Sequence, residues 1–150
     1  MLKARKQNKV IGFDLDGVIV DHTENKLRVA KELGVLLDVM DTPTDILNSK
    51  LEREIARQID KAIYDEPRIA LTPPLFPGSI VAIKHVSKLW PYFLISRRTA
   101  NDCALQLLRA RGLWPRYFNE KNTFFVKSRE DKNFKAKELG INIYIDDQPS

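Results

Sequence analysis

KVIGFDLDG, residues 9–17, is a short apolar run that ends at a carboxylate and continues into a second carboxylate and a glycine. A run of this kind, bounded by turn residues, predicts a buried strand with a turn directly after it. Asp14 and Asp16 therefore follow the strand, and Gly17 can supply the positive φ that a tight turn requires. Taken alone these residues are explained by a plain turn, so their meaning depends on what the rest of the chain brings beside them.

From Gly78 onward, helical and strand patterns alternate along the chain. Apolar runs predict strands at 91–95, 123–126 and 142–145. Apolar residues at helical spacing predict helices at 79–88, 100–110 and 131–139. Strands separated by helices of this length indicate βαβ units, so we expect an α/β fold with a Rossmann-like parallel sheet.

Residues 18–77 separate the first strand from this alternating region and carry a different pattern. Apolar residues at helical spacing predict two amphipathic helices, over 25–37 and 45–63. Four prolines then punctuate the last part, where we expect an irregular connector because proline lacks the amide hydrogen that helices and ladders need. We expect an α/β core, 1–17 and 78–150, with a small helical cap, 18–77, inserted after the first strand.

The composition is that of one soluble globular domain. The chain has 150 residues, of which 43% are hydrophobic and 30% charged, which excludes a disordered or collagen-like chain. It holds no run of about 18 apolar residues, so we expect no membrane partner. The single cysteine, Cys103, excludes an internal disulfide and favours a reducing compartment, so we expect a cytoplasmic location.

The net charge of +5 permits a nucleic-acid partner. Acidic residues interleave with most of the basic ones, which is typical of solvated surfaces, so nucleic acid is the less favoured partner. An anionic small substrate is an equally direct use of a positive charge.

Polar side chains follow three of the four predicted strands at the point where each strand ends. Asp14 and Asp16 follow the first strand, Ser96 the second, and Asp146 and Asp147 the fourth. In open α/β sheets, ligands bind at the carboxyl ends of the strands. Clustered carboxylates repel one another unless a cation neutralises them, and oxygen ligands beside a phosphate suit Mg²⁺. Because a hydroxyl is a suitable donor to phosphoryl oxygens, the set predicts a Mg²⁺-dependent phosphoryl-transfer site.

A lysine at the same edge completes such a set, and the sequence offers three. Lys127 follows the third strand directly, Lys132 begins the next predicted helix, and Lys135 lies one turn further on. We favour Lys132 and keep the other two as alternatives.

Five further residues are candidates for contact with a substrate. Arg97 and Arg98 follow Ser96 directly, and arginine recognises phosphate or carboxylate bidentately, so one of them can bind a second anionic group. The other interpretation of these arginines is solvent exposure or an ion pair. Asp21, His22 and Lys26 follow the first strand closely enough to reach a substrate, although His22 also fits as a polar residue at a helix start.

Four short segments resemble, in order, the four motifs of the haloacid dehalogenase-like (HAD) superfamily. They are FDLDGVIVD at 13–21, LISRR at 94–98, Lys132, and YIDDQP at 144–149. The first motif is highly specific, the last is moderately so, and the other two are weak. The resemblance covers the chain from residue 9 to its end except for the insert, and it implies a HAD core with a cap over the active site.

The resemblance also implies a role for each matching residue. Asp14 would attack phosphorus and form an aspartyl-phosphate, and Asp16 would protonate the leaving oxygen and then activate water. Asp16 favours phosphate chemistry, because the dehalogenase branch lacks this second aspartate. Ser96 would donate a hydrogen bond to the phosphoryl group. Asp14, the Asp16 backbone carbonyl and Asp147 would hold Mg²⁺, with Asp146 beside them as an outer or water-mediated ligand.

These roles describe a Mg²⁺-dependent phosphomonoester hydrolase that acts on a small phosphorylated metabolite. The stretch SREDK…IDDQP resembles the 5′(3′)-deoxyribonucleotidase branch, so a nucleotide is the first expected substrate and a sugar phosphate the next. A phosphate-accepting receiver module is less favoured, because its acceptor aspartate follows a middle strand. A non-catalytic HAD-like protein that binds phosphate or nucleic acid is the alternative.

The chain is short for this pattern, since it stops soon after the last expected metal ligand. We expect a minimal domain whose C-terminal edge is bare, truncated or covered by a partner. Whether the protein ends naturally at Ser150, and its oligomeric state, stay open at this point.

Overall fold

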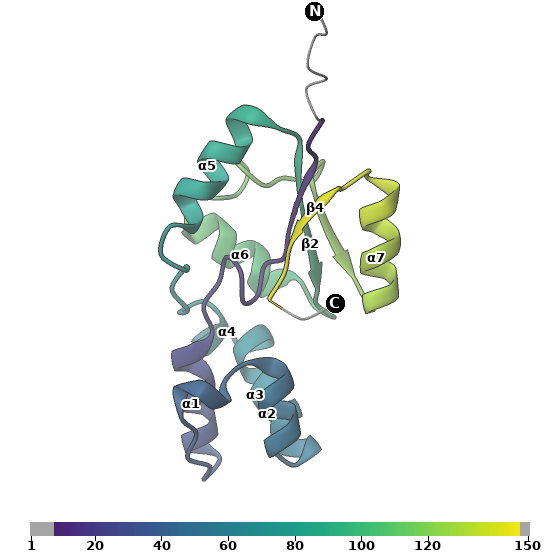
Figure 1. Ribbon diagram of the computed structural model, residues 1–150. Helices are drawn as coiled ribbons and strands as arrows, with labels where there is room; N and C mark the ends of the chain where they lie inside the picture. Colours follow the sequence, from purple (N-terminus) through teal and green to yellow (C-terminus); the bar gives the residue numbers. More distant parts are fainter. Residues whose placement is uncertain (1–7, 148–150) are drawn as a thin grey trace, which may run out of the picture.

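The computed structural model describes residues 8–147, and the question about Ser150 lies outside them. A parallel four-stranded sheet forms the centre of the molecule, with the strand order β3-β2-β1-β4 (Figure 1). The strands are β1 (Ile11–Phe13), β2 (Tyr92–Arg97), β3 (Thr123–Val126) and β4 (Ile143–Ile145). The predicted α/β, Rossmann-like parallel sheet is confirmed.

Helices cover both faces of this sheet. Helices α5 (Ser79–Leu89) and α6 (Asp102–Ala110) lie on one side, and α7 (Arg129–Glu138) lies on the other (Figure 1). Side chains of β1, β2, α5 and α6 share one buried apolar cluster, of which Phe13, Leu94 and Leu107 are members. Burial of this apolar surface is the main force that fixes the strand ends relative to one another.

The segment between β1 and α5 is helical and lies beyond the carboxyl ends of the strands (Figure 1). Its elements are α1 (Thr23–Glu32), the 3₁₀ helix η1 (Val39–Asp41), α2 (Thr44–Lys50), α3 (Arg53–Asp65) and α4 (Pro67–Ala70). They surround a second buried apolar cluster that includes Val29, Leu47, Ile59, Ile63 and Ile69. We refer to residues 23–70 as the cap helices.

Three details of the cap helices differ from the sequence prediction. Helix α1 ends at Glu32 rather than at residue 37, because Gly34 follows with a φ of 83°. The helix predicted over 45–63 is two helices, separated where Leu51 adopts an extended backbone. The predicted irregular connector contains α4, which begins at Pro67, a position where the missing amide hydrogen costs nothing.

Two chain segments connect the cap helices to the core, one between β1 and α1 and one between α4 and α5. They run beside each other, with the amide of Asp21 donating to Pro74 O and the amide of Phe76 donating to Ile19 O, both at 2.9 Å. Helices α3 and α4 also contact α6. One such contact joins Cys103 Sγ to Asp65 O at 3.5 Å. The cap helices are therefore held against the core both at the connection and beside it.

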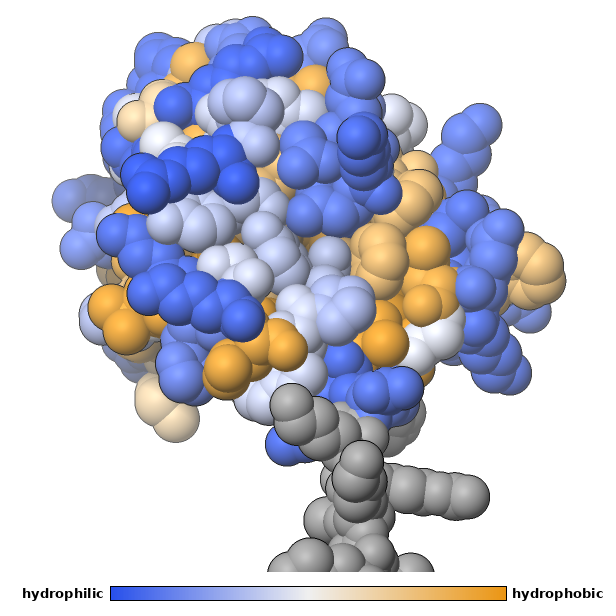
Figure 2. Space-filling model, turned by 90° about the horizontal axis from the view of Figure 1, so that it is seen from above, coloured by the Kyte–Doolittle hydropathy of each residue, from blue (hydrophilic) through white to orange (hydrophobic). Residues whose placement is uncertain are grey.

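The end of the core opposite the cap helices presents mainly hydrophilic residues with smaller apolar areas between them (Figure 2). None of the helices within residues 8–147 has the length and apolar content that crossing a membrane requires.

Candidate active site between the core and the cap helices

Three carboxylates meet where β1 and its neighbour β4 end. Asp14 follows β1, and Asp146 and Asp147 follow β4, so the pairing of these strands places the residues side by side. One carboxylate oxygen of each lies within 4.8 Å of the others. Asp14 is buried, whereas Asp146 and Asp147 are exposed. The predicted convergence of strand-end carboxylates is present in the structure.

Gly17 allows the β1 loop to approach Asp147. It adopts a φ of 84°, and its amide donates to Val20 O at 2.9 Å, which closes the turn. A Cβ atom at this position would lie 2.0 Å from Asp147 Oδ2. Only glycine satisfies both the backbone angle and the close approach.

Lys132 connects two of these carboxylates. Its buried Nζ lies 3.4 Å from Asp14 Oδ2 and 3.1 Å from Asp146 Oδ2. Lys127 is exposed, and Lys135 pairs with a glutamate of its own helix. Of the three candidate lysines, the structure therefore brings Lys132 to Asp14.

The carboxylates carry more negative charge than their surroundings balance. Burial raises the pKa of Asp14 to about 8, and the charges of Asp146 and Asp16 add to the rise while Lys132 opposes it. Burial and a hydrogen bond with Asp146 also raise the pKa of Asp147. A bound cation would offset the repulsion among these carboxylates, and an all-oxygen donor set of this kind suits Mg²⁺.

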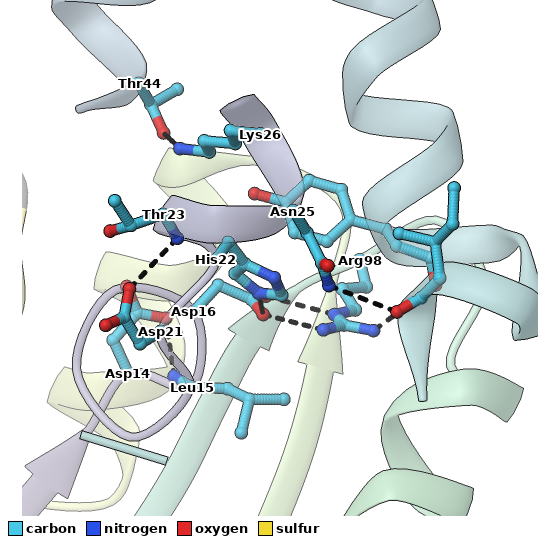
Figure 3. A network of polar contacts seen from close by, with 12 residues as sticks. Asp14, Leu15, Asp16, Asp21, His22, Thr23, Asn25, Lys26, Thr44 and Arg98 are labelled. Atoms are coloured by element: carbon cyan, nitrogen blue, oxygen red, sulfur yellow. Dashed lines mark hydrogen bonds and ion pairs between the residues drawn. The ribbon is translucent and has the colours of Figure 1, made fainter. Parts of the chain in front are cut away.

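Asp16 is held differently, by donors on both of its oxygens (Figure 3). Its Oδ1 accepts from His22 Nε2 and from Arg98 Nη2, both at 2.6 Å, and its Oδ2 accepts from Arg98 Nε at 3.0 Å. Burial alone would raise the pKa of Asp16, but the Arg98 guanidinium and the hydrogen bonds from His22 and Arg98 lower it well below its usual range.

This arrangement changes the interpretation of Arg98. The sequence left open a contact with a second anionic group of the substrate or an ion pair. In the structure the guanidinium is paired with Asp16 and stacks 5.0 Å from the centre of the Tyr64 ring. Its side chain is 1% exposed. Arg97 is exposed and lines the cavity described below.

Ser96 and His22 each carry a buried polar atom without a partner among residues 8–147. Ser96 lies at the end of β2, is fully buried, and its Oγ makes no hydrogen bond there. It does not line the cavity. His22 Nδ1 is likewise unpaired, although Nε2 bonds Asp16. Buried polar atoms of this kind are costly unless a ligand or water satisfies them.

A cavity of about 590 Å³ lies between the core and the cap helices. The core contributes Asp14, Asp16, Arg97, Thr99, Lys132 and Asp147 to its walls. The cap helices contribute Lys26, Thr44, Arg57, Asp60, Lys61 and Tyr64. A volume of this size accommodates a small metabolite.

The sequence analysis missed most of the cap-side wall. Five of its members lie on α3 at positions 57, 60, 61, 64 and 65, a spacing that places side chains on one helix face. The spacing is visible in the sequence, but a charged helix face usually points to solvent. Only the position of α3 over the strand ends shows that this face lines a cavity.

No protein-family model and no curated protein matches this sequence. Solved structures do match. A haloacid dehalogenase-like hydrolase from Streptococcus pneumoniae superimposes with a TM-score of 0.61 at 19% identity over 91% of this chain and 73% of its own. The fold is that of the haloacid dehalogenase-like hydrolases. The HAD-like fold implied by the four sequence motifs is thereby confirmed.

Two other solved structures share the HAD-like fold at similar distance. A HAD-superfamily hydrolase of subfamily IA from Geobacter sulfurreducens has a TM-score of 0.56 at 15% identity, over 94% of this chain and 79% of its own. A protein described as a predicted phosphatase from Clostridium acetobutylicum has a TM-score of 0.58 at 14% identity, over 92% of this chain and 74% of its own. At these identities the similarity establishes the fold, and activity has to be argued from the site.

Proposed function

We propose that this chain is a Mg²⁺-dependent phosphomonoester hydrolase that transfers the phosphoryl group of its substrate to Asp14. The observation that carries the proposal is the position of Asp14, which is buried at the end of β1, 3.4 Å from Lys132 Nζ and grouped with Asp146 and Asp147. The HAD-like fold supports it, as does the description of one neighbour as a predicted phosphatase.

The residues present fit a magnesium ion. Asp14 and Asp147 would hold it with the backbone carbonyl of Asp16, and Asp146 lies close enough to act directly or through water. Burial and the neighbouring carboxylates raise the pKa values of Asp14 and Asp147, so a bound cation would favour their ionised forms. Bound Mg²⁺ would neutralise phosphoryl oxygens, so that a carboxylate and a phosphate dianion can approach each other.

In the first half of the reaction, a carboxylate oxygen of Asp14 attacks phosphorus. The bond from phosphorus to the ester oxygen breaks, and Asp16 passes a proton to the leaving alcohol. Because the pKa of Asp16 is lowered in the free site, it must first take up this proton from solvent as the substrate binds. For this Asp16 must exchange a contact with His22 or Arg98 for the leaving oxygen. Lys132 stabilises the phosphoryl oxygens as charge develops on them.

In the second half, water attacks the phosphorus of the aspartyl-phosphate and Asp16 takes its proton. The bond between phosphorus and Asp14 breaks, which releases inorganic phosphate and restores the carboxylate. The role proposed for Ser96, donation to a phosphoryl oxygen, requires its buried hydroxyl to reach the cavity and gives its unpaired Oγ a partner.

A non-catalytic protein that binds a phosphorylated ligand is the second candidate function. The observation that favours it is the engagement of both Asp16 oxygens by Arg98 and His22. If these contacts persist with a substrate bound, no group in this position exchanges the proton that turnover requires.

Phosphate release separates the two candidates. The wild-type chain and Asp14→Asn are assayed with Mg²⁺ against p-nitrophenyl phosphate, nucleoside 5′-monophosphates, sugar phosphates and phosphorylated acids. We expect turnover by the wild type and a loss of at least about 10³-fold in Asp14→Asn, because removal of a nucleophile abolishes the covalent route. Asp45→Asn, an exposed acid on α2, is the matched control. Binding of Mg²⁺ without turnover of any substrate would favour the second candidate.

A further inference from the structure

Lys26 is a buried cation whose two hydrogen bonds go to neutral acceptors. It lies on α1, and 8% of the residue is exposed. Its Nζ donates to Thr42 O at 2.8 Å. It also donates to Thr44 Oγ1 at 3.3 Å (Figure 3). No carboxylate within residues 8–147 forms an ion pair with it. An ammonium group has three hydrogens to donate, so one of them remains available.

Lys26 is one of the residues that line the cavity. It is four residues after His22, which caps the start of α1, and therefore lies on the same side of the helix, about 6 Å further along the axis. His22 contacts Asp16 at 2.6 Å. The ammonium group thus belongs to the same cavity as the catalytic carboxylates, one helical turn further into the cap.

Helix α3 supplies a second cation to this part of the wall. Lys61 is exposed and lines the cavity. Arg57 also lines it, but its guanidinium pairs with Glu54 at 3.0 Å, so its charge is already balanced. Asp60 and Asp65 are the carboxylates that α3 contributes to the cavity wall. The charge of Asp60 stabilises the ammonium of Lys26, but no ion pair joins the two within residues 8–147. Lys26 and Lys61 are therefore two cations of this wall without an ion pair among the described residues.

We propose that Lys26 and Lys61 bind a second anionic group of the substrate, a carboxylate or a second phosphate. This rests on the proposed function, and it restricts the substrates to small phosphorylated acids and bisphosphates. The transferred phosphoryl group lies at the carboxylate end with the metal, and the second anion lies at the lysine end. A phosphorylated acid binds with its phosphate at the metal end, because only that group can be transferred, and with its carboxylate at the lysines. A bisphosphate fits in either direction.

Matched substrates test the proposal. 3-Phosphoglycerate differs from glycerol 3-phosphate by a carboxylate in place of a hydroxymethyl group, and glucose 1,6-bisphosphate differs from glucose 6-phosphate by one phosphate. We expect the wild type to favour the doubly anionic member of at least one pair by about tenfold or more in kcat/KM. The pair that responds distinguishes a carboxylate site from a phosphate site.

Substitution of the lysines should reduce this preference. We expect Lys26→Met to lower the ratio of the two kcat/KM values by about 10- to 100-fold, the usual value of a hydrogen bond to a charged group. We expect Lys61→Met to lower it by about threefold, because this lysine is exposed. Lys31→Met changes an exposed lysine of α1 that lies outside the cavity and should leave the ratio unchanged.

The ratio of the two kcat/KM values distinguishes recognition of the substrate by Lys26 from a purely structural role of this lysine. If Lys26 only fixes the loop at Thr42 and Thr44, Lys26→Met lowers both members of a pair equally, and the proposal is wrong. A wild-type ratio near one, or a preference for nucleoside monophosphates over every doubly anionic compound, also overturns it. If Lys26→Met does not fold, the smaller loss expected of Lys61→Met decides.

Binding separates failure of this proposal from failure of the proposed function. Calorimetry of the Mg²⁺-loaded protein with 3-phosphoglycerate and with glycerol 3-phosphate gives the same ratio without turnover. A binding preference that Lys26→Met removes supports the second anionic site even where no phosphate is released, and equal binding overturns it.

Discussion

The two ends of the cavity hold their charges in opposite ways. At the core end, Asp14, Asp146 and Asp147 are drawn together, with Lys132 as their nearby cation. At the cap end, Lys26 is buried against a carbonyl and a hydroxyl. The core end therefore groups carboxylates around one lysine, whereas the cap end holds a buried ammonium whose hydrogen bonds go to neutral acceptors, with Asp60 as a nearby carboxylate. In the proposed account, a metal ion binds at the first end and the second anion of the substrate at the other.

Asp16 is the exception at the core end, because its charge is already balanced. Arg98 joins it to the cap helices, since the same guanidinium donates to Tyr64 O at 3.4 Å. This pair links the core to the cap helices, and it lies between the strand-end carboxylates and Lys26. Each of the following predictions concerns a substitution in one of these features.

The largest expected effect on stability comes from Arg98→Met. Removing the guanidinium leaves the Asp16 carboxylate without its main partner, and we expect a loss of about 3 kcal/mol in the free energy of unfolding at pH 7. Because the pKa of Asp16 is lowered in the folded state, its stabilising contribution is present above pH 3.8 and is lost as the pH falls further. Urea unfolding should therefore show the difference shrinking below about pH 4.

Arg97→Met is the matched control for this change. Arg97 is the exposed neighbour, and we expect a change below about 0.5 kcal/mol. Equal losses in the two variants, or a loss in Arg98→Met that does not depend on pH, would contradict the assigned ion pair.

The next effect concerns the metal. Asp147→Asn removes one of the three converging carboxylates, and we expect the Mg²⁺ concentration for half-maximal activity to rise about 10- to 100-fold. Titration of Mg²⁺ into the EDTA-treated protein measures it, with Asp45→Asn as the control. Activity that survives EDTA would exclude the proposed metal dependence.

A smaller effect of opposite sign is expected for Asp14→Asn in metal-free protein. Between pH 3.8 and about 8 the folded state holds a proton on Asp14 that the unfolded state has released, so stability falls as the pH rises through this range. We expect the free energy of unfolding of Asp14→Asn to exceed that of the wild type by about 2 kcal/mol at pH 8.5 and to equal it near pH 4. Thermal unfolding across this range, with and without Mg²⁺, measures it, and a destabilised variant at pH 8.5 would contradict the account.

The smallest effect separates two glycines with nearly the same backbone. Gly17 and Gly34 have φ values of 84° and 83°, but a Cβ at Gly34 meets nothing within 4 Å. We expect Gly34→Ala to cost about 1 kcal/mol, from the backbone angle alone. Gly17→Ala should cost about 1 kcal/mol more, because Asp147 must move, and should also weaken Mg²⁺ binding. Equal stability and equal Mg²⁺ affinity would show that the close approach to Asp147 has no energetic role.

The core end was predictable from the sequence because strands impose a simple rule. Apolar runs locate β1 to β4, and the residues that follow each run reach the same edge of a parallel sheet. Asp14, Asp146 and Asp147 were identified in this way, and the structure brings them together. Among the three lysines the sequence favoured Lys132 with two alternatives left open, and the packing of α7 against the sheet brings Lys132 to Asp14.

The cap end was less predictable for two physical reasons. Leu51 ends α2 without a glycine or proline, so the sequence showed one helix where the structure has two. In the sequence, the charged face of α3 that includes positions 57, 60, 61 and 64 predicts a solvated surface. Only the position of α3 over the strand ends shows that this face lines the cavity. For Arg98 the sequence left a substrate contact and an ion pair both open, because a charged side chain after a strand has no visible partner in the sequence; the structure shows the ion pair, with Asp16.

Trapping of the covalent intermediate tests the central claim most directly. The wild type is mixed with a turned-over phosphomonoester and Mg²⁺, quenched in acid, digested, and analysed by mass spectrometry. The account predicts one phosphoryl group on the peptide that contains Asp14, bound at that carboxylate, and none in Asp14→Asn. A phosphoryl group at another residue, or phosphate release by Asp14→Asn at the wild-type rate, would contradict it.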